Sequence, residues 1–528
     1  MRIGLIPLDE RPVNTRYPQM IAAAAGAEVL LPPRETLSDL RTPANCAALA
    51  DWLRETAPTM DALIACVEMV GYGGLIASRT TDDPLSTVLA RLEVLREVKV
   101  RRPTMPLLAF SVITRISNAD YNLEEPLYWD RYGTRLYRLS QLMDRARQGE
   151  QLADELASLR AAIPPEHQHD FLRRRHRNHA VNLAAVHMLA EGAFDLLVLS
   201  SDDTSPYGLG SREKRWVAEM ADRLGLLDGE ADGDKAQAGA PAVGAATAGV
   251  QRLLMYPGAD EVGCALLARL LNQAHGATPR MAPFYAVPGG AEIVAPYEDG
   301  PVRVTVERQI RACGAALAPE GADGDIWLAV NPPVPRRSEW APEHADQERS
   351  ERTPHLRMLA AQIRRRQDNG RPVVLADVAY PNGADPALID AVSRVVRLPA
   401  LAAYGAWNTA GNTIGTALTQ GCAALLARTE EGRAAQEHFL LHRFVEDWGY
   451  QQVVRREARD WLLQTVGRDD PLPEELDATR AFIEPRLSAL IDELPGFAGR
   501  WRIAPGSTRL PWRRLFEVDF DLERTEAL

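Results

Sequence analysis

The chain lacks a net positive charge and has few cysteines, and each shortage argues against a class of protein. Lysine occurs only at Lys99, Lys214 and Lys235, and the net charge is −12. A nucleic-acid surface needs a basic footprint, which this composition does not supply. The five cysteines are scattered, odd in number and without Cys-x-x-Cys spacing. We therefore expect buried, reduced thiols rather than disulfides or a metal site, and no cofactor.

Long apolar runs and the common nucleotide and acyl-transfer motifs are also missing. No apolar stretch approaches the roughly 20 residues that span a bilayer. No Gly-x-Gly-x-x-Gly or Walker-type lysine follows a strand, and there is no Gly-x-Ser-x-Gly elbow. The segment from Met1 to Pro7 enters a strand directly, without the apolar region of a signal peptide. We expect a cytoplasmic protein that binds neither membrane nor nucleic acid.

What the chain does contain is an alternation of short apolar runs with helical patterns over 528 residues. Strand alternating with helix is typical of parallel β/α units, so the predicted class is α/β. The predicted strands lie at 3–8, 28–31, 62–67, 107–113, 195–200, 252–256, 284–287, 326–330, 373–377 and 401–405. The predicted helices include 84–98, 135–162, 178–191, 261–273 and 387–394.

Polar residues follow so many of these strands that we favour a TIM-barrel-like arrangement over two doubly wound lobes. The expected domains are an N-terminal β/α region at 1–228, a second β/α region at 250–429 and a helical C-terminal region at 430–528. Residues 229–249 are rich in Ala, Gly and Asp and are expected to form a linker or insertion. Aromatic residues of the C-terminal region are expected in the core or in subunit contacts, which is compatible with a homo-oligomer: Phe444, Trp448, Tyr450 and Trp461.

The strongest candidate site is the pair Asp202-Asp203, directly after the apolar run Phe194 to Ser200. Open α/β sheets and β/α barrels place their ligands at the carboxyl ends of such strands. Two neighbouring carboxylates push their pKa values apart, so that one stays charged while the other carries a proton. Helix capping and divalent-ion binding are the alternative interpretations of the pair.

Other strands are followed by carboxylates, carboxamides, arginines and aromatic residues. This mixture suits a neutral, polyhydroxylated ligand, because Asp and Asn bind vicinal hydroxyls while Trp and Tyr pack on an apolar sugar face. The predicted substrate-binding residues are Asp9, Arg11, Asn14, Glu68, Arg115, Tyr207, Asp260, Glu261, Asp377, Asn382, Trp407 and Asn408.

Two members of this set have specific alternatives. Asp260-Glu261 precedes a predicted helix, where the two acids would serve as N-cap and first-turn residues. Trp407 lies in a glycine-flanked loop, where an exposed Trp would be a poor core residue, so we expect it to contact a ligand. Asp260-Glu261 also remains an alternative to Asp202-Asp203 as the catalytic pair.

Four segments together resemble a bacterial family catalogued as domain of unknown function 4127. They are Leu8 to Asn14, Ser201-Asp202-Asp203, Gly258 to Gly263 and Gly405 to Asn412, and the resemblance runs from Met1 to beyond residue 500. This resemblance implies that the protein hydrolyses β-linked N-acetylgalactosaminides.

The tandem acids are similar to those of glycosidases that use the substrate's own 2-acetamido group as nucleophile. By that analogy Asp202 polarises the acetamide and Asp203 is the general acid and base. Adjacent strand residues point to opposite faces, so both acids reach one sugar only if the chain turns at Asp202. Two other functions stay open: a divalent-metal hydrolase with ligands Asp202, Asp203, Asp9 and Glu68, and a sugar-binding protein without activity.

Overall fold

The computed structural model describes residues 1–202, 204–227, 252–336 and 338–525. By their internal contacts the residues form two compact units, Met1–Arg34 with Pro257–Leu528, and Glu35–Tyr256. We call the first the split unit and the second the inserted unit. The predicted linker at 229–249 and the candidate Asp203 lie outside the described residues. Among the described residues, no helix combines the length and apolar character that a membrane crossing requires.

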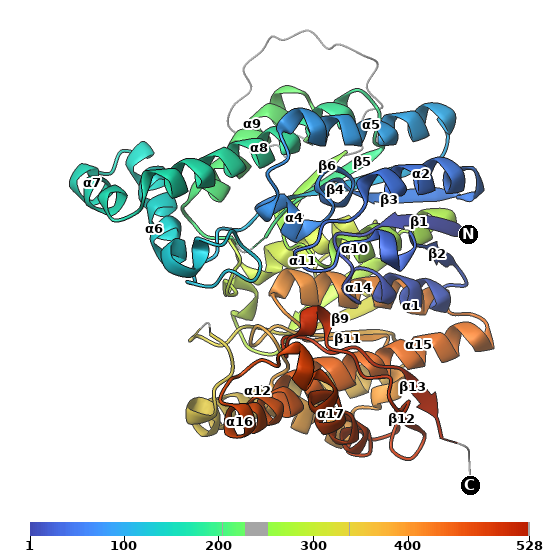
Figure 1. Cartoon of the computed structure of the whole chain (residues 1–528). Helices are drawn as coiled ribbons and strands as arrows, with labels where there is room; N and C mark the ends of the chain where they lie inside the picture. Colours follow the sequence, from blue (N-terminus) through green and yellow to red (C-terminus); the bar gives the residue numbers. More distant parts are fainter. Residues whose placement is uncertain (203, 228–251, 337, 526–528) are drawn as a thin grey trace. The chain divides into compact units, whose positions relative to one another are not determined.

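A parallel sheet of buried strands forms the centre of the inserted unit (Figure 1). Its strands, in spatial order, are β3 (Ala62–Cys66), β4 (Leu107–Ile113), β5 (Leu196–Ser201) and β6 (Leu253–Pro257). Every residue of β3, β4 and β5 is buried, which explains why these strands appear in the sequence as continuous apolar runs. In the register Phe110 of β4 lies opposite both Cys66 of β3 and Val198 of β5.

Helices connect these strands, as the alternating pattern predicted. They are α2 (Cys46–Thr56), α3 (Val67–Tyr72), α4 (Leu75–Thr80), α5 (Leu85–Arg101), α6 (Trp129–Arg147), α7 (Ala153–Ala161), α8 (Pro165–Ala190) and α9 (Leu209–Arg223). The single helix predicted at 135–162 is two helices, because α6 ends before Gly149, whose φ of 104° is left-handed.

The split unit contains a five-stranded parallel sheet. Its spatial order is β11 (Ala403–Gly405), β10 (Val373–Asp377), β9 (Ile326–Asn331), β7 (Arg280–Tyr285) and β8 (Ala316–Leu317). Strands β1 (Arg2–Ile6) and β2 (Glu28–Leu30), which flank α1 (Arg16–Ala24) in the sequence, pair parallel with each other. The other helices before the C-terminal region are α10 (Val262–Ala274), α11 (Val302–Ala312), α12 (Ala345–Asp368), α13 (Pro386–Val395) and α14 (Ala410–Leu426).

The C-terminal region is helical only in part. It contains α15 (Glu430–Arg443), the π-helix η6 (Phe444–Val454), α16 (Arg455–Val466) and α17 (Leu476–Ile491). Beyond Ile491 two strands, β12 (Trp501–Ile503) and β13 (Leu522–Arg524), pair antiparallel. The prediction of a wholly helical region was wrong here, because strands of three residues are too short to show a period of two in the sequence.

Aromatic side chains of η6 belong to the core of the split unit. Phe444 and Tyr450 are fully buried, and the Phe444 ring stacks on Tyr404 of β11 with centroids 4.1 Å apart. The predicted core role of Phe444 and Tyr450 is therefore confirmed.

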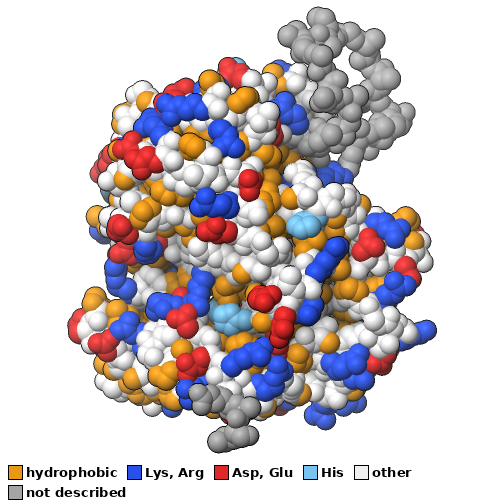
Figure 2. Space-filling view, turned by 90° about the vertical axis from the view of Figure 1, so that its right-hand side faces the viewer, with side chains coloured by type: hydrophobic (Ala, Val, Ile, Leu, Met, Phe, Trp, Pro, Cys, Tyr) orange, Lys and Arg blue, Asp and Glu red, His pale blue; other side chains and the backbone are white. Residues whose placement is uncertain are grey.

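The α/β class is confirmed, whereas the barrel is not. The described strands form open sheets, and the five-stranded sheet of the split unit ends at β8 and β11 rather than closing on itself. Figure 2 shows basic, acidic and apolar side chains interspersed over the face that it displays.

Candidate functional site

The loop that follows β1 folds around the carboxylate of Asp9. Asp9 accepts hydrogen bonds from the Arg11 backbone N–H at 3.0 Å, from Arg11 Nη2 at 2.7 Å and from Asn14 Nδ2 at 2.9 Å. An Asp that bonds the backbone two residues further on is a common turn former. One short loop thus holds three of the predicted residues together.

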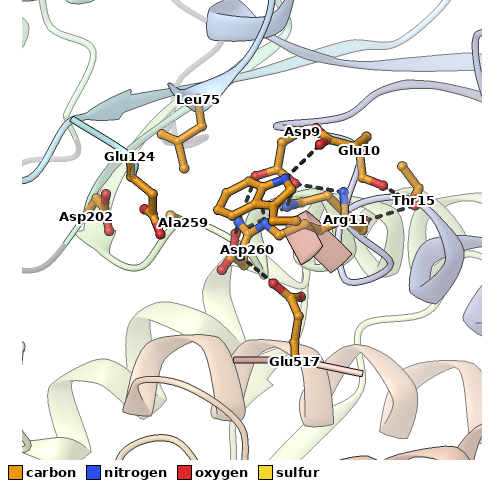
Figure 3. A network of polar contacts seen from close by, with 12 residues as sticks. Asp9, Glu10, Arg11, Thr15, Leu75, Glu124, Asp202, Ala259, Asp260 and Glu517 are labelled. Atoms are coloured by element: carbon orange, nitrogen blue, oxygen red, sulfur yellow. Dashed lines mark hydrogen bonds and ion pairs between the residues drawn. The ribbon is translucent and has the colours of Figure 1, made fainter. Parts of the chain in front are cut away.

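Arg11 connects this loop to two distant segments of the split unit (Figure 3). Its Nη2 donates to Asp260 Oδ1 at 2.5 Å, and its Nη1 lies 3.7 Å from Glu517 Oε1. Asn14 Nδ2 also donates to Asp260, at 3.2 Å. The side chains of Arg11, Asp9, Asp260 and Glu517 are at most 6 % exposed. We call this group the Arg11 cluster: Asp9, Arg11, Asn14, Asp260 and Glu517.

The three carboxylates of the Arg11 cluster differ in their contacts with the guanidinium. Arg11 donates charge-assisted hydrogen bonds to Asp9 and Asp260. Glu517 lies farther away, and burial raises its pKa to about 8, although Arg11 and Arg514 oppose the rise. The cluster therefore combines two carboxylates that are bonded to the guanidinium with an acid, Glu517, that carries a proton near neutral pH.

Strained backbone surrounds the Arg11 cluster. Trp512 and Arg513 have φ values of 53° and 58°, a left-handed conformation that is costly for bulky residues. Trp512 is held there because its Nε1 donates to Glu10 Oε1 at 2.7 Å and its ring packs under Arg11, 4.4 Å from the guanidinium carbon. Such strain concentrates at functional sites, which supports a role for this cluster.

Asp260 and Glu261 are neighbours in sequence but have separate surroundings. Asp260 accepts from Arg11, Asn14 and Asn408 Nδ2, the last at 3.2 Å. Glu261 is fully buried and accepts from Gln309 Nε2 at 2.7 Å and from the Ala259 N–H at 3.0 Å. Burial raises the pKa of Glu261 to about 7. Glu261 occupies the N-cap position of α10, but its side chain makes no capping hydrogen bond.

Trp407 is buried, so the expectation of an exposed Trp was wrong. Its side chain is 2 % exposed, and its ring makes an edge contact with Phe516 at 6.2 Å between centroids. Among the described residues its Nε1 has no hydrogen-bond partner. The glycines at 405 and 411 allow close backbone approach at this position rather than exposure of the indole.

The π-helix η6 holds the loop of Trp407 and Asn408 beside the loop of Asn382. Asp447 Oδ2 accepts from the Ala406 N–H at 2.6 Å, and the Asp447 carbonyl accepts from the Ala384 N–H at 3.1 Å. The Asn382 N–H donates to the Asn408 carbonyl at 3.0 Å. Both asparagines have positive φ, 59° and 63°. Rare π-helical turns are frequent at functional sites, and this one positions two of the predicted loops.

Asp377 organises the loop after β10. It accepts from Asn331 Nδ2 at 2.8 Å and from the Asp385 N–H at 2.6 Å, and it is buried. Burial, together with the nearby Asp385, raises the pKa of Asp377 to about 7. Asn382 Nδ2, in the same loop, donates to Glu339 Oε1 at 2.7 Å.

A second cluster lies in the inserted unit, at the carboxyl end of β5. Arg79 Nη2 donates to Asp202 Oδ2 at 2.5 Å, and Arg79 Nη1 donates to Glu124 Oε2 at 3.2 Å. Arg115 Nη2 donates to the same Glu124 oxygen at 3.0 Å, and Glu125 is within 3.5 Å of Arg79. We call this group the Arg79 cluster: Arg79, Arg115, Glu124, Glu125 and Asp202.

Burial varies within the Arg79 cluster. The side chains of Arg79 and Glu125 are at most 6 % exposed, while Asp202 is 14 % and Arg115 is 25 % exposed. Burial raises the pKa of Glu125, and the two arginines oppose this. Asp202 and Arg115 are therefore the partly exposed members of the cluster, whereas Arg79 and Glu125 are buried.

Two predicted residues of the inserted unit lie outside the Arg79 cluster. Glu68 is buried and accepts from Ser111 Oγ at 2.8 Å and from the Val112 N–H at 3.0 Å, and burial raises its pKa. Tyr207 is 39 % exposed, and Arg145 lies over its ring.

Some residues of these clusters escaped the sequence analysis. Glu517 and Trp512 belong to a C-terminal segment without a recognisable motif, and Glu124 does not directly follow a strand. Asp447 did carry a signal, because Glu446-Asp447 is an acidic pair in an otherwise apolar and aromatic stretch. Among the described residues, no three His, Cys, Asp or Glu side chains are arranged to hold a metal ion.

Comparison with known proteins identifies one family. The sequence model of the family described as "Protein of unknown function (DUF4127)" matches residues 3–233 and 235–521. Neither the curated proteins nor the solved structures gave a match.

Proposed function

This chain belongs to the DUF4127 family, and we propose that it is a retaining exo-glycosidase. The proposed substrates are β-linked N-acetylhexosaminides, with N-acetylgalactosamine preferred, and the reaction needs no cofactor. The substrate's own acetamide oxygen is the nucleophile, which makes an enzyme nucleophile unnecessary.

The observation that carries the proposal is the ion pair between Arg79 and Asp202. Asp202 follows β5 directly, it is 14 % exposed, and its Oδ2 accepts from a nearly buried guanidinium at 2.5 Å. The guanidinium supplies this carboxylate with a charge-assisted hydrogen bond. An anion is what the acetamide-polarising residue must be, because it accepts the acetamide N–H and stabilises the positive charge that develops on the oxazolinium ring.

The proposed reaction proceeds in two balanced steps. In the first, the acetamide carbonyl oxygen attacks the anomeric carbon, the glycosidic bond breaks, and Asp203 gives its proton to the leaving oxygen. In the second, Asp203 takes a proton from water, and the water oxygen opens the oxazolinium ring at the anomeric carbon. Two inversions at that carbon give net retention, and Asp203 ends protonated as it began.

Exposure divides the other predicted substrate contacts. Arg115 and Tyr207 are partly or well exposed and belong to the same unit as Asp202, so we assign them direct contact with the sugar or its aglycone. Glu68, Glu261, Asp377 and Trp407 are buried, so we assign them to the support of the loops that carry the contacts. Asp9, Arg11, Asn14 and Asp260 are equally buried, so we assign the Arg11 cluster to the support of the loops of the split unit, with Asn382 in the adjoining loop.

The test compares chromogenic β-N-acetylgalactosaminide with the corresponding N-acetylglucosaminide. The wild type should hydrolyse the first faster, and Asp203→Asn should lower kcat by about 10²–10⁴-fold, the usual contribution of general acid–base catalysis. Asp222→Asn, an exposed aspartate of the same unit, is the matched control and should retain full activity. A folded wild type inactive on both substrates would refute the proposal, and an undiminished Asp203→Asn rate would move the chemistry to Asp260-Glu261. Loss of activity with a chelator would favour the metal hydrolase instead.

A further inference from the structure

A groove lies on the split unit between α12 and α13, apart from both clusters in sequence. Its volume is about 1020 Å³, at the upper limit of the range for ligand sites. On the α12 side the lining residues include Arg349, Thr353 and Arg357, which recur every four residues and so share one face of the helix. Residues 387–395 of α13 form the opposite wall. The groove therefore follows the seam between two packed helices.

The floor and the walls of the groove differ in chemistry. The floor contains Ala360, Ala387 and Ala391, which are buried and small enough for the two helices to pack closely. The walls carry five arginines and two aspartates, which leaves a net charge of +3 on the lining. That charge is opposite in sign to the net charge of −12 on the whole chain.

Only part of the positive charge is neutralised within the chain. Arg349 pairs with Asp390, and Arg364 pairs with Asp368. The side chains of Arg357, Arg365 and Arg394 are exposed and make no ion pair or hydrogen bond with the described residues. Three guanidinium groups therefore surround an apolar floor with their donors available to a ligand.

The spacing of the charges favours a linear ligand. Arg357 and Arg365, the two unpaired arginines of α12, are eight residues apart, or about 12 Å along the helix at 1.5 Å per residue. That interval is close to the length of one disaccharide in an extended glycan. A chain with one acidic group per disaccharide would therefore meet Arg357 and Arg365 in successive repeats, while its sugar rings lie over the alanine floor.

We propose that the groove between α12 and α13 binds an acidic glycan in which N-acetylhexosamine alternates with an acidic sugar. The choice of a glycan rests on the proposed function, whereas the anionic character rests on the arginines alone. Guanidinium groups bind carboxylates and sulfates through paired N–H donors, which suits this ligand class.

The experiment measures binding of a fluorescent chondroitin sulfate oligosaccharide by anisotropy. The full-length protein should bind it, and a tenfold rise in salt should weaken binding strongly, because exposed charges are screened. Replacing the three unpaired arginines together, as Arg357→Ala, Arg365→Ala and Arg394→Ala, should raise Kd at least tenfold. The matched control replaces three exposed arginines of the inserted unit, Arg101→Ala, Arg147→Ala and Arg160→Ala, and should leave Kd unchanged.

Three results would overturn the inference. They are no binding by the wild type, an equal loss of affinity in the control variant, or tighter groove-dependent binding of polyglutamate than of the glycan, which would indicate an acidic protein partner. The groove variant should hydrolyse the chromogenic monosaccharide at the wild-type rate. Glycan binding without any hydrolysis would therefore refute the proposed glycosidase activity but support glycan binding in the groove. Hydrolysis without glycan binding would support the glycosidase activity but refute glycan binding in the groove.

Discussion

At the scale of single residues, the notable feature is an arginine that holds several carboxylates in a nearly dry environment. Arg11 does this for Asp9, Asp260 and Glu517, and Arg79 does it for Asp202, Glu124 and Glu125. Buried carboxylates without a counter-charge would repel one another and take up protons. Each arginine therefore offsets the mutual repulsion of the carboxylates around it.

Arg11→Met should destabilise the protein by about 3–5 kcal/mol, because it leaves buried carboxylates without their partner. Urea denaturation at neutral pH measures this change. Arg2→Met is the matched control, since the Arg2–Glu28 pair is 46 % and 60 % exposed and such pairs contribute at most about 1 kcal/mol. Equal effects of the two substitutions would contradict the account of the Arg11 cluster.

Glu517 should make stability depend on pH. Its pKa of about 8 in the folded protein exceeds the ordinary value of about 4.3, so the folded state retains a proton that the unfolded chain has lost between these pH values. The free energy of unfolding should therefore fall as pH rises through this window, by up to about 1.4 kcal/mol per pH unit.

Glu517→Gln should remove that part of the slope, because glutamine does not titrate. Unfolding curves at pH 5, 6, 7 and 8 provide the measurement, and the exposed Glu474→Gln is the control that should retain the wild-type slope. A Glu517→Gln variant with an unchanged slope would show that Glu517 is ionised in the folded protein.

Residue patterns predicted which polar side chains follow strands, but not their burial. Asp9, Arg11 and Asn14 were found because they follow β1 within eight residues. Glu517 and Trp512 were not found, because they lie more than 200 residues after Asp260 in the sequence and meet the cluster only in the folded chain. Trp407 was misjudged for the same reason, since Phe516, the residue packed against its ring, is distant in sequence.

At the scale of elements, η6 connects the core to the loops that carry Asn382 and Asn408. Its Asp447 is fully buried and pairs with Arg443 Nη2 at 2.6 Å while accepting from the Ala406 N–H. The helix therefore fixes loop backbone through a charged side chain rather than through apolar packing alone.

Asp447→Asn should loosen this attachment without changing side-chain size. A hydrogen bond to a charged group contributes about 1.5–3 kcal/mol, so we expect exchange of the Ala406 amide hydrogen to accelerate tenfold or more. Hydrogen exchange followed by mass spectrometry of peptides covering residue 406 measures the effect. The exposed Asp460→Asn on α16 is the control, and unchanged protection in Asp447→Asn would show that η6 does not hold the loop.

The sequence predicted long buried elements better than short or irregular ones. Strands β4 and β10 were predicted to the residue, because continuous apolar runs bounded by polar residues mark strands buried on both faces. Strands β8, β12 and β13 have two or three residues and leave no period to detect. The π-helix was not predicted either, because its hydrogen-bond pattern depends on packing rather than on local propensity.

At the scale of the whole molecule, the contacts unite the first 34 residues with the segment after residue 257. Sequence composition predicts domain boundaries where it changes, as at residues 229–249. It does not indicate that segments far apart in the chain pack together. The Arg11 cluster is a direct result of this arrangement, because Arg11 and Asp260 are 249 residues apart in the chain.

The central claim is that the substrate's acetamide is the nucleophile and that an anionic Asp202 lies beside it. The most direct test is to weaken that nucleophile. The hydrolysis rate would be measured for chromogenic galactosaminides whose N-acyl group is acetyl, fluoroacetyl, difluoroacetyl or trifluoroacetyl. We predict a steady fall in kcat along this series, because each fluorine withdraws electrons from the attacking oxygen. A rate that is independent of fluorination would contradict the account.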